Sequence, residues 1–120
     1  TLQAEKGDAA GAAKTFSEIG KDSAVPPALR DAAKVRAGWL LIDSAPYDQV
    51  SAEIEAMATP QNALRNSARE ALGLSAYKAG DFKKARDWFQ QIADDANAPR
   101  TVANRAQIML DLIAASGKAA

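Results

Sequence analysis

The stretch that decides the fold is "YKAGDFKKARDWFQQI", residues 77–92, because it sets a glycine and an aspartate between two segments that favour helix. A similar stretch, "EKGDAAGAAKTFSEI", occupies residues 5–19. When the two stretches are superposed, the following residues coincide: Gly7 and Gly80, Asp8 and Asp81, Ala12 and Ala85, Phe16 and Phe89, and Ile19 and Ile92. Glycine can end one helix and aspartate can cap the next, so each stretch predicts a turn between two packed helices.

The composition favours helices throughout. The chain has 120 residues, of which 48% are hydrophobic, and alanine supplies much of that share. Alanine is the best helix former and a poor strand former. Apolar residues recur at spacings of three and four, with proline or glycine between the runs. We therefore predict an all-α protein with a short helical tail to about residue 6, then helices near 8–20, 27–43, 47–58, 61–79, 82–95 and 100–116.

Turn residues fit these boundaries. Proline is predicted at helix starts, where its missing N–H costs little, and these prolines are Pro26, Pro27, Pro46, Pro60 and Pro99. Asp8 and Asp81 are predicted to be N-cap residues, and Gly117 a C-terminal cap.

A second internal repeat relates the middle of the chain to itself. The segment "ALRDAAKVRAGWLLIDSAPYDQVSAEI" from Ala28 matches "ALRNSAREALGLSAYKAGDFKKARDWF" from Ala63 at a constant offset of 35 residues. Gly38 then falls on Gly73 and Ile54 on Phe89. A period of this length, built from two helices, is typical of a helical-repeat solenoid of antiparallel helix pairs. We predict one domain over 1–120, with units of about 1–25, 26–59 and 60–98 and a capping helix over 99–117.

Asp111 is informative because it stands where the repeat has Gly38 and Gly73. A carboxylate buried there under a second helix, without a partner, would be costly. We therefore expect Asp111 to be exposed and residues 100–116 to form a true terminal helix. At the other end, the first helix of a unit is cut to about six residues, so we expect an excised fragment whose array continues N-terminally.

The repeated positions resemble a known family, the tetratricopeptide repeat (TPR). The resemblance rests on a small residue at Gly38 or Gly73, a turn at Ala45 or Gly80, an aromatic residue at Tyr47 or Phe82, a small residue at Ala85, an aromatic residue at Phe89, and then proline. The middle unit matches less well because Val50 replaces the usual alanine. The resemblance implies helix pairs stacked into an array with a concave face.

A narrower resemblance concerns the ending "AGDFKKARDWFQQIADDANAPRTVANRAQIMLDLI", residues 79–113. It is similar to the C-terminal part of the bacterial TPR-like ancillary subunits of the Sec translocon. That family implies an inner-membrane protein with one N-terminal transmembrane helix and a periplasmic repeat domain. It also implies a role in assisting secreted proteins alongside periplasmic chaperones.

The concave face of such an array is lined by the first helix of each unit. Its candidate protein-binding residues are Val35, Trp39, Ile42, Glu70, Leu74, Tyr77, Lys78 and Leu112. They form either an apolar groove that accepts an apolar helix or extended segment, or simply the packing between adjacent first helices. The Lys, Asn and Arg clamp with which some TPR proteins bind C-terminal carboxylates is absent from Val35, Trp39, Glu70 and Leu74.

The composition also excludes several functions. Cysteine and histidine are absent, which excludes zinc–thiolate sites, thiol nucleophiles and Ser-His triads. The net charge is zero, so nothing calls for a nucleic acid. No apolar run approaches the roughly 20 residues that span a bilayer. We expect no enzyme, no catalytic residue, no metal and no cofactor.

We therefore expect a soluble protein–protein interaction domain on the periplasmic side of a bacterial inner membrane, attached only through a missing N-terminal anchor. Its expected partners are translocon components, periplasmic chaperones or secreted clients. The alternatives are a TPR adaptor in cell-envelope assembly and a self-associating scaffold, including a homodimer.

Overall fold

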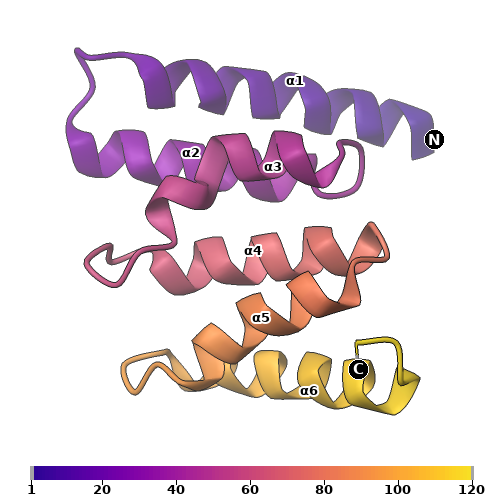
Figure 1. The fold of residues 1–120 in the computed structure, drawn as a ribbon. Coiled ribbons are helices and arrows are strands. Elements are labelled where there is room, and N and C mark those ends of the chain that lie inside the picture. The colour runs from indigo at the N-terminus through magenta and orange to yellow at the C-terminus, as the bar shows by residue number, and fades with distance from the viewer. Residues whose placement is uncertain (1, 120) are drawn as a thin grey trace.

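The computed structural model describes residues 2–119, and every regular element in that range is helical (Figure 1). The elements are α1 (Leu2–Lys21), α2 (Pro27–Leu41), α3 (Tyr47–Ile54), the short 3-10 helix η1 (Glu55–Met57), α4 (Arg65–Lys78), α5 (Phe82–Ala93) and α6 (Arg100–Ser116). The prediction of an all-α fold is confirmed. None of the helices in this range is both long and apolar enough to cross a membrane.

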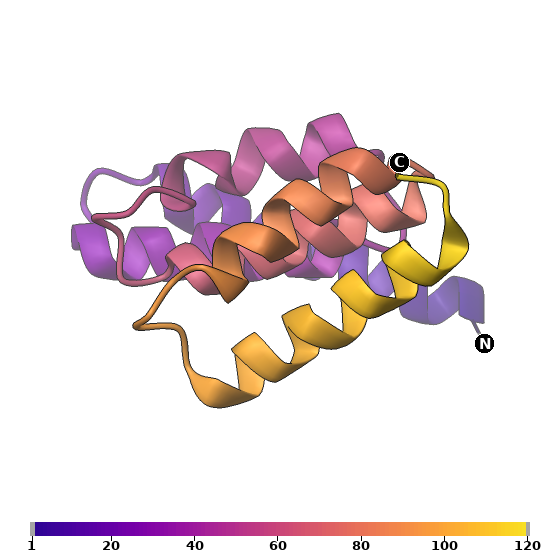
Figure 2. The same ribbon diagram turned by 60° about the horizontal axis from the view of Figure 1, so that its bottom comes forward.

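The helices lie in chain order and successive helices run in opposite directions, from α1 at one end of the molecule to α6 at the other (Figure 1). Each helix packs on the next one along the chain. In addition, α4 contacts both α2 and α6, so these three helices lie side by side. Figure 2 shows α5 and α6 running in opposite directions at the C-terminal end, joined by the loop that precedes α6.

Proline marks the start of α2, α3 and α6, as predicted. Three helices have a proline as N-cap residue: Pro26, Pro46 and Pro99. The prediction for Pro60 is wrong, because Pro60 lies in a turn and α4 begins only at Arg65. The Asn62 side chain accepts a hydrogen bond from the N–H of Leu64 at 2.8 Å. This local turn competes with helix and delays the start of α4.

The turn at Gly80 and Asp81 has the predicted geometry. Gly80 has a positive φ of 82°, which glycine adopts without strain. The carboxylate of Asp81 accepts a hydrogen bond from the N–H of Lys84 at 3.0 Å, so Asp81 is the N-cap of α5. Gly117 ends α6 in the left-handed conformation, as predicted.

The matching turn at Gly7 and Asp8 does not exist, because α1 runs unbroken through both residues. Residues 2–21 are therefore one helix. The expected break between the tail and the next helix is wrong, whereas the predicted helix over 8–20 lies within α1. Across the Gly80 turn, the rings of Tyr77 and Phe82 meet edge to face with centroids 5.1 Å apart. The corresponding residues of the first stretch are alanines 4 and 9. Without that aromatic contact, an alanine-rich segment keeps its helical hydrogen bonds.

Several helix ends differ from the predicted bounds by a few residues. Helix α2 ends at Leu41, and α3 ends at Ile54 and continues as η1. Helix α5 ends at Ala93.

Two glycines allow the helices of each pair to cross closely. A Cβ on Gly38 would lie 2.5 Å from Cγ2 of Ile54, and one on Gly73 would lie 2.7 Å from Cζ of Phe89. Both contacts are shorter than packed carbon atoms allow. The predicted close crossings of α2 with α3 and of α4 with α5 are confirmed.

The core follows from these crossings. Its largest fully buried side chains are Phe89, Ile54, Leu72, Ile92, Ile113 and Val50. They come from α3, α4, α5 and α6, so the interior extends along the array instead of collecting at one centre.

Candidate protein-binding groove

A groove of about 470 Å³ lies across the three helices that pack side by side. Its lining residues are Trp39 of α2, Glu70 and Leu74 of α4, and Arg105, Ile108 and Met109 of α6. We call it the α2–α4–α6 groove. Most of the lining is apolar, and the side chain of Ile108 is 59% exposed.

Trp39 is fixed in this groove by its indole N–H. The Nε1 atom donates to the backbone carbonyl and to the hydroxyl of Ser67, both at 3.2 Å. Trp39 is half-buried. Because its polar atom is satisfied on the α4 side, the rest of the ring is an apolar surface whose position is set before any partner arrives.

One ion pair lies in the groove. Arg105 donates from Nε to Oε2 of Glu70 at 2.7 Å and from Nη2 to Oε1 at 2.9 Å. Glu70 is buried, whereas the Arg105 side chain is 55% exposed. The hydrogen bond to Glu70 raises the pKa of Arg105 above its ordinary value. Such a two-point contact holds the guanidinium in one orientation at the rim.

Three predicted binding residues meet in the groove: Trp39, Glu70 and Leu74. Val35 does not, and its prediction as a surface residue is wrong. Val35 is 7% exposed and belongs to the buried cluster that contains Ala13 of α1. The same cluster contains Val50 of α3 and Ala68 of α4, so Val35 lies in the interior of the array.

The other predicted residues lie outside the groove lining. Tyr77 packs on Phe82, and Ile42 is half-buried against the core. The ammonium of Lys78 donates to the backbone carbonyls of Ile42 and Asp43, which ties the end of α4 to the end of α2.

Leu112 is 51% exposed but lies one helical turn beyond Ile108 and does not line the groove. The sequence analysis missed Arg105 and Met109. The signal that could have found Arg105 is its position 35 residues after Glu70, the same offset that relates the repeats.

A polar cluster joins the start of α4 to the end of α5. The carboxylate of Asp95 accepts from Nε of Arg65 at 2.6 Å, from Nη1 of Arg69 at 3.1 Å and from the amide of Asn66 at 3.0 Å. The hydrogen bond from Arg65, followed by those from the backbone N–H of Asn97 and the amide of Asn66, holds the pKa of Asp95 far below its ordinary value. Each of the four side chains contacts another within the array, although Nε of Arg69 is buried without a hydrogen-bond partner. We interpret the cluster as a clamp between helices.

The α2–α4–α6 groove holds one carboxylate, that of Glu70, which is paired with Arg105. Among residues 7–119, whose side chains the structure describes, no three acidic side chains gather closely enough to hold a metal ion. Comparison of the chain with protein families, curated proteins and solved structures finds no match.

Proposed function

We propose that this chain is a non-enzymatic protein-interaction domain, and that its α2–α4–α6 groove binds an apolar helix or extended segment of another protein. The observation that carries the proposal is the preformed lining: a half-buried Trp39 with its N–H satisfied, next to an exposed Ile108. Large aromatic side chains with one open face are frequent energetic centres of protein interfaces. A rigid surface loses little conformational freedom on binding.

We further propose that the array is of the TPR type and that its parent protein acts on the periplasmic side of the bacterial inner membrane, next to the Sec translocon. Support comes from the repeated pattern around Gly38 and Gly73, which lie at close helix crossings, and from the similarity of residues 79–113 to the ancillary translocon subunits. The partners would be secreted clients, periplasmic chaperones or translocon components.

A matched pair of substitutions tests the groove. Ile108 and Leu29 are both aliphatic, on helices, and almost equally exposed at 59% and 60%, but only Ile108 lines the groove. With an unfolded secretory protein or a periplasmic chaperone domain as titrant, Ile108→Ala should weaken binding by about 1–2 kcal/mol, roughly 5- to 30-fold in Kd. Leu29→Ala should bind as the native chain does.

In the same titration, Trp39→Ala should weaken the binding free energy by roughly 2 kcal/mol or more. Circular dichroism must show that the variant keeps its helices. Equal Kd values for Ile108→Ala and Leu29→Ala would reject the groove as the binding surface, and so would a folded Trp39→Ala variant with native affinity.

A further inference from the structure

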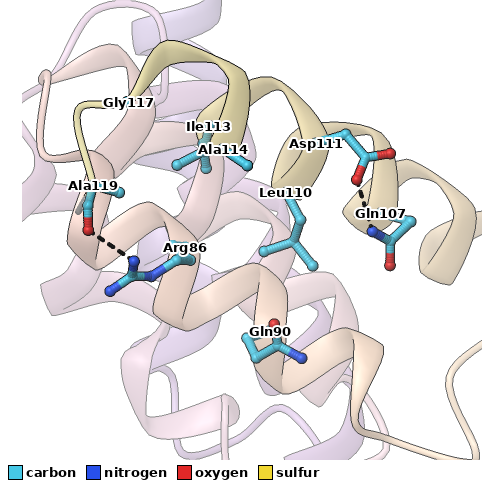
Figure 3. Close-up of a pocket in the computed structure, with 9 residues that line it drawn as sticks. All are labelled: Arg86, Gln90, Gln107, Leu110, Asp111, Ile113, Ala114, Gly117 and Ala119. Carbon is cyan, nitrogen blue, oxygen red and sulfur yellow. Dashed lines mark hydrogen bonds between the residues drawn. The ribbon is translucent and has the colours of Figure 1, made fainter.

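The C-terminal end of the array carries a second hollow, between α5 and α6 (Figure 3). It has a volume of about 390 Å³. Its lining residues are Arg86, Gln90, Gln107, Leu110, Asp111, Ile113, Ala114, Gly117 and Ala119. Figure 3 shows Leu110 pointing from α6 toward α5, with Asp111 and Gln107 at one edge and Arg86 bonded to the carbonyl of Ala119 at the other.

The repeat assigns a role to this part of α6. When Pro26 is placed on Pro99, Ala37, Gly38 and Leu41 of α2 fall on Leu110, Asp111 and Ala114. In α2 those three residues are buried, and Gly38 lies directly against Ile54 of α3. This side of α2 is therefore the surface on which the second helix of its unit packs.

On α6 the same surface is uncovered. Leu110 is half-buried, and Asp111 and Ala114 are exposed. We call these three residues the open face of α6. It is a first-helix surface for which residues 2–119 supply no second helix.

Helix α1 presents the complementary situation. Its residues Ala12, Phe16 and Ile19 match Ala85, Phe89 and Ile92. In α5 these three counterparts are completely buried. In α1, Ala12 and Phe16 are only half-buried and Ile19 is 36% exposed. We call them the open face of α1: a second-helix surface with no first helix over it among the described residues.

We propose that the open face of α1 in one copy of this chain fits the open face of α6 in another, and that Asp111 is the residue that keeps the two copies apart. In the α4–α5 pair, Phe89 lies where a side chain on residue 73 would be, since a Cβ there would be 2.7 Å from the ring. Because Phe16 matches Phe89 and Asp111 matches Gly73 in the repeat, docking of two copies would place Phe16 of one copy against Asp111 of the other. A carboxylate at that point clashes with the ring and would be buried without a partner.

Two features of Asp111 agree with this role. Its carboxylate is hydrogen-bonded only to the amide of Gln107 on the same helix, at 3.0 Å, and it forms no ion pair among residues 7–119, whose side chains the structure describes. The fold therefore does not depend on it. The contact that it prevents joins opposite ends of the array, so it would not close on itself and would grow into an open chain of copies.

Sedimentation velocity on the 120-residue chain tests the proposal. Asp111→Gly restores the residue found at the other two crossings, and should associate at least tenfold more tightly than the native chain, with species larger than dimers as concentration rises. Adding Phe16→Asp to Asp111→Gly should return the chain to native behaviour. Asp87→Gly, which removes an exposed aspartate of α5, is the control and should change nothing.

The proposal is overturned if folded Asp111→Gly is no more associated than the native chain, or if its association survives Phe16→Asp. It is also overturned if the native chain already assembles end to end as tightly as the variant. Should glycine unwind α6 in circular dichroism, Asp111→Ala decides instead, and should give a smaller but measurable gain because its methyl group keeps the two helices slightly apart.

Discussion

Replacing Gly73 by alanine adds one methyl group at the tightest point of the α4–α5 crossing. The new Cβ would lie 2.7 Å from Cζ of Phe89 and 2.9 Å from each Cε, and Phe89 is completely buried. Ordinary carbon contact begins near 3.4 Å, so ring and helix must separate by about 0.7 Å. Overpacking of this kind costs roughly 1–3 kcal/mol, whereas alanine gains about 1 kcal/mol over glycine in a helix.

Gly11→Ala is the matched control, because Gly11 lies inside α1 and its Cβ would meet nothing within 4 Å. This variant should be stabilised only by the higher helix propensity of alanine, by about 0.5–1 kcal/mol. The propensity gain is common to both variants, so the difference between them isolates the packing cost and should be roughly 1–3 kcal/mol. Urea unfolding followed by circular dichroism measures it. If Gly73→Ala raises the unfolding midpoint as much as Gly11→Ala does, the crossing is not as close as we describe.

Three further predictions concern polar contacts. Hydrogen bonds lower the pKa of Asp95, so its contribution to stability is full above the ordinary carboxyl pKa of about 4 and is lost as pH falls further. In the Asp95→Asn variant, the urea unfolding midpoint should therefore fall less between pH 5 and pH 2 than it does in the native chain. Arg105→Ala leaves Glu70 buried without its partner and should cost about 1–3 kcal/mol, much of which Glu70→Gln should restore. Trp88→Phe removes the hydrogen bond to Tyr47 and should cost about 1 kcal/mol in thermal unfolding without changing client affinity.

Local chemistry explains which parts of the fold were predictable. The Gly80 turn follows from neighbouring residues alone: a glycine for positive φ, a capping aspartate and two aromatic rings. The Gly7 stretch has the same glycine and aspartate, but alanines occupy the positions of Tyr77 and Phe82, so no aromatic contact spans the turn. A turn requires both a backbone that can bend and side chains that gain contacts when it bends. The match between the two stretches at glycine and aspartate indicates only the first of these.

The candidate groove was predictable in part for a similar reason. Trp39 and Leu74 occupy equivalent positions of two repeats, so their meeting on one face follows from periodicity. Val35 has the same helical spacing but belongs to a buried cluster, because the periodicity of a single helix does not reveal how many neighbours that helix has. Arg105 was missed because a charged residue on a terminal helix ordinarily faces water, and its pairing with Glu70 depends on how α6 docks on α4.

The most direct test of the groove uses the two indole N–H groups of the chain as reporters in ¹H–¹⁵N correlation spectra. The chain has two tryptophans: Trp39 lies in the α2–α4–α6 groove, and Trp88 lies in another hollow, bonded to Tyr47. On titration with an unfolded secretory client, the Trp39 indole signal should shift or broaden with the binding isotherm while the Trp88 signal stays in place. Binding that moves the Trp88 signal and leaves that of Trp39 unchanged would contradict the groove.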